Sequence, residues 1–192
     1  MNISLVGVGG QGILLTSEIL SRTAALAGMD VKKSEIHGMA QRGGSVISQV
    51  RFGARVFSPI IINGMSDILV AFEKTEALRW RPLLKAGGKA LVNNQEILPI
   101  TVSSGQQPAV ENPDSKLGEF FGDSLSTINA AALSSEAGNP RTANMVIAGA
   151  LSTLTPFTAD LWHEAMAGRI PAKLLDVNLK AFEAGRAAIS AP

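Results

Sequence analysis

The residues best suited to chemistry begin near the N-terminus, where an apolar stretch leads into a glycine-rich run. Gly7, Gly9 and Gly12 follow the G-x-G-x-x-G spacing, and Gly10 and Gln11 lie between the last two. When a strand continues through such a loop into a helix, free backbone N–H groups meet the positive end of the helix dipole and can bind an anion such as phosphate. The run therefore predicts an anion-binding turn, although a tight turn in which glycine permits close packing is the simpler interpretation.

A dinucleotide site would also need a carboxylate about 20 residues further on, at the end of the second strand, to hold a ribose hydroxyl. Asp30 precedes the short strand expected over Val31–Ser34, and Glu35 follows it. That strand carries two lysines and is not the continuous apolar run of a buried parallel strand. The sequence therefore favours the packing interpretation, and a stand-alone NAD(P)- or flavin-binding oxidoreductase is kept as the alternative function.

A second candidate site follows in a glycine-rich stretch without periodicity, expected as a functional or interface loop over residues 36–44. It contains His37 and the run Gln41-Arg42-Gly43-Gly44. The arginine guanidinium is a permanently charged fork of donors, and bare glycine backbone lets a ligand approach closely, so the group suits a carboxylate or phosphate. Taken alone, the same residues are also typical of an exposed arginine in a turn.

The rest of the sequence excludes several kinds of chemistry. There is no cysteine, which removes disulfides, cysteine-held iron–sulfur clusters and thiol catalysis from this chain. Tyrosine, a G-x-S-x-G elbow and a Gly-Lys-Ser/Thr phosphate loop are also missing. His163 lies beside Trp162 and Glu164 on an expected amphipathic helix, which is typical of a packing or surface residue. We therefore expect no catalytic residue and no metal site in this chain.

The composition indicates a partner. Hydrophobic residues make up 46% of the chain and charged residues only 17%, so we expect another chain to cover part of the surface. A monomer with a polar, uncharged surface is the alternative. The net charge is +1, with no basic cluster longer than a pair, which argues against nucleic-acid binding. No apolar stretch approaches the roughly 20 residues of a membrane span, and no signal peptide is visible. We expect a soluble, cytoplasmic protein.

The order of the expected elements predicts a three-layer α/β/α sandwich, Rossmann-like, with a mostly parallel sheet and an antiparallel hairpin, in one domain over residues 1–192. Strands are expected at 3–6, 31–34, 45–52, 55–61, 67–72 and 89–92. The hairpin is expected to join 45–52 to 55–61 through Gly53-Ala54. Helices are expected at 13–26, 73–84, 117–125, 130–137, 141–154, 158–167 and 173–189, and 103–115 is expected as a loop.

Three blocks carry a resemblance that spans nearly the whole chain. The first is Gly7–Gly12, the second Ser34–Val46, and the third Asn144–Gly149 with the tail Asn178–Gly185. With these blocks in this order, the chain resembles the gamma-type subunits or domains of the 2-oxoacid:ferredoxin oxidoreductases. Within that family it resembles the beta subunits of the indolepyruvate ferredoxin oxidoreductases. The middle block is long and unusual enough to be specific.

The resemblance implies an accessory subunit of a multi-subunit enzyme of the pyruvate or indolepyruvate type. Such an enzyme decarboxylates a 2-oxoacid oxidatively to an acyl-CoA and passes electrons to ferredoxin. Thiamine diphosphate, magnesium, iron–sulfur clusters and coenzyme A are implied for the whole complex, with none assigned to this chain alone. The implied partners are a larger thiamine diphosphate and iron–sulfur subunit and, through the complex, ferredoxin. The isolated chain is expected to be inactive. Whether it forms a homodimer is left open.

The motifs and the resemblance together predict two contact strips on this chain. One strip is formed by Gly9, Gly10, Gln11 and Gly12, with Gly7 before it, and the other by His37, Gln41, Arg42, Gly43 and Gly44. Whether these strips touch coenzyme A, thiamine diphosphate or only the partner chain is left open by the sequence, as is the identity of the 2-oxoacid.

Overall fold

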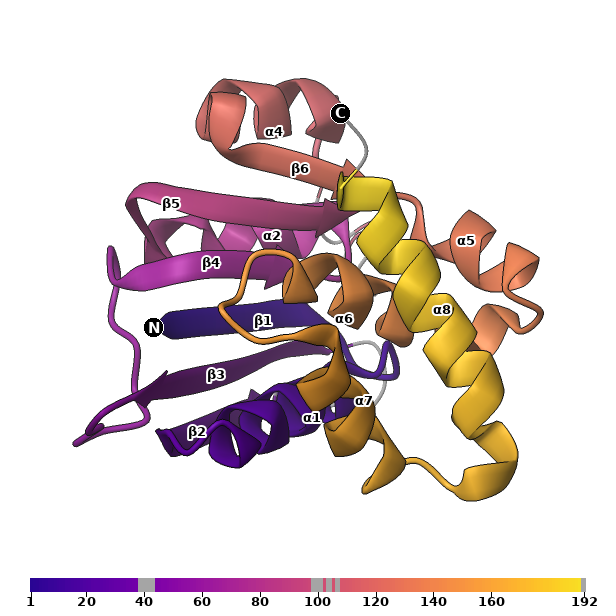
Figure 1. Cartoon of the computed structure of the whole chain (residues 1–192). Coiled ribbons are helices and arrows are strands. Elements are labelled where there is room, and N and C mark those ends of the chain that lie inside the picture. Colours follow the sequence, from indigo (N-terminus) through magenta and orange to yellow (C-terminus); the bar gives the residue numbers. More distant parts are fainter. Residues whose placement is uncertain (38–43, 98–101, 103–104, 106–107, 191–192) are drawn as a thin grey trace.

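A six-stranded sheet forms the middle layer of the computed structural model, which describes residues 1–37, 44–97, 102, 105 and 108–190 (Figure 1). The strands lie in the order β2-β3-β1-β4-β5-β6. Their bounds are β1 Asn2–Val8, β2 Asp30–His37, β3 Ser45–Gly53, β4 Ser66–Ala71, β5 Leu84–Asn93 and β6 Leu125–Ile128. β1, β4, β5 and β6 are parallel, whereas β3 runs antiparallel to both of its neighbours. The predicted mixed sheet is confirmed.

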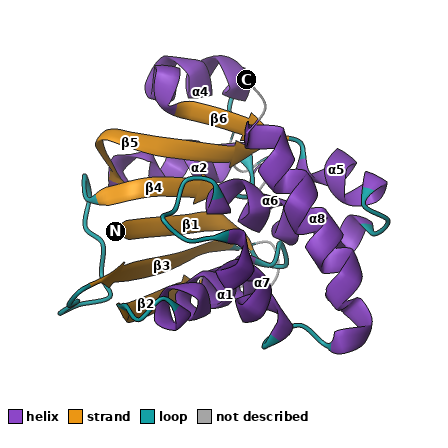
Figure 2. Ribbon diagram, in the orientation of Figure 1, coloured by secondary structure: helices purple, strands orange, loops and turns teal. Residues whose placement is uncertain are grey.

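Helices cover both faces of the sheet, which confirms the predicted three layers (Figure 2). One side carries α1 Ile13–Leu26, α5 Ala130–Glu136, α6 Ala143–Ser152, α7 Ala159–Ala167 and α8 Ala172–Ser190. The other side carries α2 Lys74–Trp80 and α4 Pro113–Phe121. The short 3-10 turns are η1 Arg81–Leu83, η2 Gly122–Ser124 and η3 Pro140–Thr142.

The central strands alternate between two hydrophobic cores, because successive side chains of a strand point to opposite faces. In β1, Ile3 and Leu5 pack with α1, α6 and α7, whereas Val6 packs with α2 and α4. In β4, Val70 belongs to the first core and Leu69 to the second. Burial on both faces explains why these two strands read as continuous apolar runs in the sequence.

The antiparallel hairpin differs from the predicted one. β3 pairs with β2, with His37 opposite Val46, and residues 55–61 form no strand. In that segment Pro59 offers no N–H for a ladder. Instead, the Gln49 side chain exchanges two hydrogen bonds of 2.9 Å with the backbone of Ile61. Side-chain contacts from β3 therefore replace the expected strand pairing.

The second strand is longer than predicted, since Ile36 and His37 extend it into the expected loop. β2 lies at the edge of the sheet, which explains why it is not a continuous apolar run. Its Lys33 pairs with Glu35 at 2.7 Å. Charged side chains on an edge strand discourage unwanted pairing with other chains.

Further boundaries differ from the prediction. Helix α4 begins at Pro113, inside the loop expected over 103–115. The expected helix 117–125 ends at Phe121, and the four residues from Leu125 form β6 instead. Gly87 and Gly88 lie inside β5 rather than before it. As predicted, Pro82 distorts the end of α2, which continues as the 3-10 turn η1.

Helices α6 and α8 cross at two glycines, as the small residues of 141–154 predicted. A Cβ added to Gly149 would lie 1.9 Å from the backbone oxygen of Phe182, and one added to Gly185 would lie 1.9 Å from that of Val146. Every residue from Asn144 to Ser152 is buried, so α6 is a central core helix. Glycine is required at this crossing because the two backbones touch.

Gly149→Ala is expected to lower the free energy of unfolding by about 3 kcal/mol or more, since the two helices must separate to admit the methyl group. The matched control is Gly118→Ala in α4, where an added Cβ meets nothing within 4 Å. This control should be neutral or stabilising by up to about 1 kcal/mol. Urea unfolding of the purified chain measures both, and equal effects would contradict the close crossing.

Candidate functional site

The glycine loop between β1 and α1 is shaped by contacts that only glycine allows. A Cβ added to Gly7 would lie 2.6 Å from Gln11 Oε1 and 2.8 Å from the Phe72 Cβ. Gly12 has φ 82°, and a Cβ there would lie 2.7 Å from the Asn144 side-chain nitrogen. The packing interpretation of the motif therefore holds at Gly7 and Gly12.

Gln11 ties together the carboxyl ends of three neighbouring parallel strands. Its Oε1 accepts a hydrogen bond from the Val8 N–H at 2.7 Å. Its Nε2 donates to the Phe72 carbonyl at 3.0 Å and to the Gln95 Oε1 at 3.1 Å. The side chain is thereby committed to the fold, and it holds the loop in place.

The two predicted contact strips meet in the described part of the chain. The Gly9 N–H donates to the Gly44 carbonyl at 2.9 Å, and Gly44 directly precedes β3. Gly10 has φ 105° and open space around the position of a Cβ. His37 ends β2. The other members of the second strip lie outside the described residues: Gln41, Arg42 and Gly43.

A cavity of about 690 Å³ opens at the first strip. It lies at the carboxyl ends of the parallel strands, where open α/β sheets place ligands. Loop residues Gly10 to Gly12 form one wall, Asn93 at the end of β5 and the nearby Gln95 another, and Arg141 and Asn144 a third. The third wall was missed in the sequence, because only the fold brings it to the glycine loop.

The local sequence explains the third wall. The Asn139 side chain accepts a hydrogen bond from the Arg141 N–H at 3.0 Å, and Pro140 occupies the first position of η3. Both features begin a helix, because a side-chain cap satisfies an exposed N–H and proline has none to lose. η3 leads directly into α6. An Asn-Pro pair before a helix of small residues was the available signal.

The cavity is electrostatically suited to an anion. Both α1 and α6 begin at its wall, through Gly12 and Ala143, and the N-terminus of a helix attracts negative charge. No acidic side chain is among its described lining residues. Arg169 is paired with Glu18 at 2.7 Å. Arg141 is exposed and has no carboxylate partner in the part of the chain that the structure describes.

Asn144 is a second polar residue in the cavity wall. It is 9% exposed, and its side-chain amide forms no hydrogen bond with any described residue. By contrast, Asn93 uses both ends of its amide, since Nδ2 donates to the Phe72 carbonyl at 3.0 Å and Oδ1 accepts from the Ala130 N–H at 3.0 Å. The Asn144 amide is therefore available to a ligand or water in the cavity that it lines.

The carboxylates proposed for a dinucleotide site lie elsewhere. β3 separates β2 from β1, so the end of β2 lies two strand spacings, or about 10 Å, from the glycine loop. Glu35 pairs with Lys33 at 2.7 Å. Asp30 lies at the opposite end of β2, where a hydrogen bond from the Lys32 ammonium holds its pKa below the ordinary value. Neither carboxylate reaches the loop.

Among the described residues, no three His, Asp or Glu side chains gather as a metal-binding group. No helix in that part of the chain is long and apolar enough to cross a membrane.

With this fold and this site, the chain belongs to the pyruvate ferredoxin/flavodoxin oxidoreductase family, whose model matches residues 2–188. It is similar to the indolepyruvate oxidoreductase subunit IorB of Thermococcus kodakarensis, with 40% identity over 188 residues, covering 96% of this chain and 93% of the relative. The chain is thus a subunit of a 2-oxoacid:ferredoxin oxidoreductase. The alternative of a stand-alone nucleotide-dependent oxidoreductase is not supported.

Solved structures share the fold. The gamma subunit of a keto/oxoacid ferredoxin oxidoreductase from Geobacter sulfurreducens has a TM-score of 0.72 and 24% identity, covering 98% of this chain and 97% of that one. The 2-oxoglutarate:ferredoxin oxidoreductase from Magnetococcus marinus, with 2-oxoglutarate, coenzyme A and succinyl-CoA bound, has a TM-score of 0.72 and 21% identity. It covers 100% of this chain and 31% of the longer chain.

Next to the site, Glu73 follows Phe72 and caps α2. Its side chain is 1% exposed and accepts hydrogen bonds from the N–H groups of Thr75 and Glu76. Burial raises the pKa of Glu73 above its ordinary value of 4.5. The folded chain therefore holds a proton on this carboxyl at a pH where the unfolded chain has released it.

The pKa of Glu73 is raised on folding, so its proton adds to the free energy of unfolding. This contribution is fully present below pH 4.5 and is lost as the pH rises through the pKa of the folded chain. Glu73→Gln removes this dependence, so wild type should lose stability relative to the variant as the pH rises. Urea unfolding from about pH 4 to about pH 8 measures the difference. Glu119→Gln, on an exposed face of α4, is the control for loss of one carboxyl. A wild-type curve parallel to that of Glu73→Gln would contradict the raised pKa.

Proposed function

We propose that this chain is the accessory subunit of an enzyme acting on a 2-oxoacid of the indolepyruvate type, and that its cavity binds an anionic part of coenzyme A. The 40% identity with an indolepyruvate oxidoreductase subunit supports the substrate class. The observation that carries the binding role is the cavity itself, which joins two helix N-termini to an arginine that has no carboxylate partner among the described residues. The proposed location is the cytoplasm.

The cofactors implied for the complex differ in how well they fit this chain. Iron–sulfur clusters do not fit, because the sequence contains no cysteine. We therefore assign the clusters, and thiamine diphosphate with its magnesium, to a larger partner subunit that passes electrons to ferredoxin. Coenzyme A fits better, since it carries phosphates and is present in the Magnetococcus marinus enzyme that shares this fold. When bound, it supplies the thiol that accepts the acyl group.

Each wall of the cavity has a distinct part in this proposal. The Arg141 guanidinium pairs with a phosphate, because its planar fork matches the phosphate oxygens. The Asn144 amide and the N–H groups at the start of α1 bind the remaining oxygens. Gly7 and Gln11 act by holding the first strip in position. The remaining residues of the strips stay proposed as contacts: Gly9, Gly10, Gly12, His37, Gln41, Arg42, Gly43 and Gly44.

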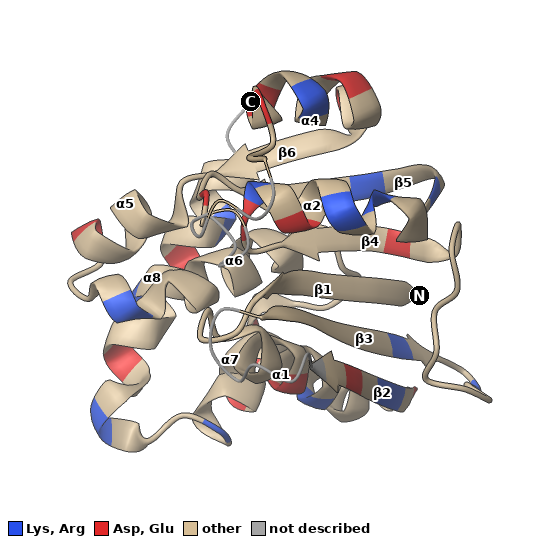
Figure 3. Ribbon diagram, turned by 180° about the vertical axis from the view of Figure 1, so that it is seen from behind, with Lys and Arg blue, Asp and Glu red and all other residues tan. Residues whose placement is uncertain are grey.

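An exposed apolar segment also supports the proposal of a partner subunit. The segment between β3 and β4 exposes large apolar side chains, with Phe57 83% and Ile62 66% exposed, and Arg55 is its one charged residue. Figure 3 shows how little charge it carries compared with α2 and α4. The side chains of Gln49 and Arg51 hold the segment against the sheet, because they donate hydrogen bonds to its backbone carbonyls. An ordered, apolar, exposed segment is typical of an interface.

We assign that interface to the larger subunit. The Magnetococcus marinus chain is about three times as long as this one and contains the same fold, so there the equivalent domain has its neighbour in the same polypeptide. In the present protein, residues 1–192 are proposed to form one gamma-type domain that docks on a separate chain. A homodimer of the isolated subunit would use the same apolar segment.

Arg141→Ala should raise the KM for coenzyme A about tenfold to a hundredfold in the assembled enzyme, since a charge-assisted hydrogen bond contributes about 1.5 to 3 kcal/mol. The kcat should change little. The assay uses the complex recovered through a tag on this chain, and recovery of a larger partner is part of the expected result. Lys89→Ala, an exposed position in β5, is the control for loss of one charge. An unchanged KM would remove the cavity from the proposal.

A further inference from the structure

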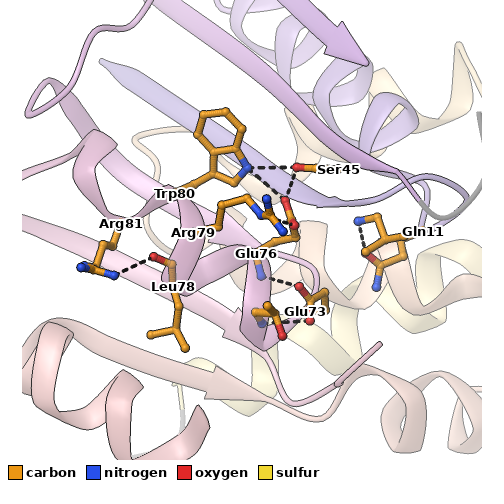
Figure 4. Close-up of polar contacts among 10 residues, drawn as sticks. Gln11, Ser45, Glu73, Glu76, Leu78, Arg79, Trp80 and Arg81 are labelled. Atoms are coloured by element: carbon orange, nitrogen blue, oxygen red, sulfur yellow. Dashed lines mark hydrogen bonds and ion pairs between the residues drawn. The ribbon is translucent and has the colours of Figure 1, made fainter. Parts of the chain in front are cut away.

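A buried carboxyl group lies beside the glycine strips without lining the cavity. Glu76, in the first turn of α2, is 3% exposed, and both of its oxygens are used (Figure 4). Its Oε1 pairs with the Arg79 Nε at 2.8 Å. Its Oε2 accepts hydrogen bonds from the Trp80 Nε1 at 3.0 Å and from the Ser45 hydroxyl.

Ser45 connects this cluster to the second strip. It is the first residue of β3 and directly follows Gly44, whose carbonyl accepts the Gly9 N–H at 2.9 Å. The Ser45 hydroxyl also accepts a hydrogen bond from the Trp80 Nε1 at 3.2 Å. Donating to Glu76 and accepting from Trp80 fixes the rotation of the hydroxyl. The backbone next to Gly44 is thus held by side chains of α2.

The other end of the cluster leads to the first strip. The Glu76 N–H donates to Glu73, which directly follows Phe72. The Phe72 carbonyl accepts the Gln11 Nε2 at 3.0 Å. The hydrogen bonds and short backbone links therefore close a ring, which runs from Gln11 through α2 to Ser45 and returns through Gly44 to Gly9.

A stabilising role alone accounts poorly for a carboxylate at this place. Burying an ion pair costs desolvation energy that offsets most of the attraction, so an apolar side chain of similar volume would hold α2 on the sheet as well or better. What an apolar residue cannot do is accept hydrogen bonds from Ser45 and Trp80 in fixed directions. The cluster thus supplies orientation at the root of the second strip.

We propose that Glu76 is a positioning residue which, through Ser45 and Trp80, sets Gly44 against Gly9 and so positions the first strip, whose Gly10 to Gly12 line the cavity. The proposal rests on the proposed function of the strips. It involves no contact between Glu76 and the ligand. Loss of the Glu76–Ser45 hydrogen bond loosens the Gly9–Gly44 contact and weakens coenzyme A binding, while the core remains folded.

The first test measures the Gly9–Gly44 contact without any ligand. Ser45→Ala should speed hydrogen exchange of the Gly9 amide about tenfold in the isolated 20.0 kDa chain, as followed by NMR. Ser45→Thr keeps the hydroxyl and should restore slow exchange. The matched control is Ser48→Ala in the same strand, because the Ser48 hydroxyl is buried and has no hydrogen-bond partner among the described residues. Equal exchange rates in Ser45→Ala and Ser48→Ala would overturn the proposal.

The second test uses the assembled enzyme. Ser45→Ala and Glu76→Gln should each raise the KM for coenzyme A about threefold to tenfold with a smaller change in kcat, and the double variant should fall short of the product of the two effects. Multiplicative effects would overturn the coupling. If Arg141→Ala raises this KM and Ser45→Ala does not, the positioning role fails and the function stands. If Gly9 exchange responds and neither KM does, the coenzyme A role fails and the contact with Gly44 stands.

Discussion

The side-chain amide of Gln11 is the constraint on which the structure at the carboxyl ends of the parallel strands depends. One end of the amide accepts from the backbone of β1, and the other donates to the ends of β4 and β5. The glycine loop cannot shift without breaking bonds to three strands at once. Gly7 has to lack a side chain because the Gln11 oxygen occupies that space. The loop, the cavity beside it and the start of α1 all take their places from this arrangement.

Much of the fold could be predicted from the sequence where burial is uniform. β1 and β4 are buried on both faces and read as apolar runs, and α1 shows a clear helical period. The prediction failed where side chains replace backbone pairing, as Gln49 does for residues 55–61. It also failed for β6, whose four residues are too short for a visible pattern.

The site could be predicted only in part, because its walls come from distant parts of the chain. The glycine run marks one wall, and the direct bond between Gly9 and Gly44 joins it to the second predicted strip. Asn144 lies against Gly12, and its carbonyl accepts the Thr16 hydroxyl at 3.4 Å, across 128 positions of sequence. No local sequence pattern predicts a contact between residues so far apart in the chain. Arg141 reaches the cavity only because η3 leads into α6, which begins beside the glycine loop.

In the proposed function, this subunit contributes a ligand-binding wall rather than a reaction centre. The sequence has no cysteine for a cluster, and the family to which it belongs comprises redox enzymes. The carboxyl ends of the strands carry features suited to binding: an arginine and an asparagine amide with no side-chain partner among the described residues, and two helix N-termini. A separate apolar segment at the opposite end of the strands is the surface proposed for docking. The proposal thus assigns binding and assembly to different ends of the sheet.

Hydrogen exchange of the assembled enzyme, measured by mass spectrometry with and without coenzyme A, tests this account most directly. Coenzyme A should slow exchange in peptides covering residues 9–15 and 139–147, which form facing walls of the cavity. Slower exchange in the partner subunit alone, with both of these peptides unchanged, would contradict the account.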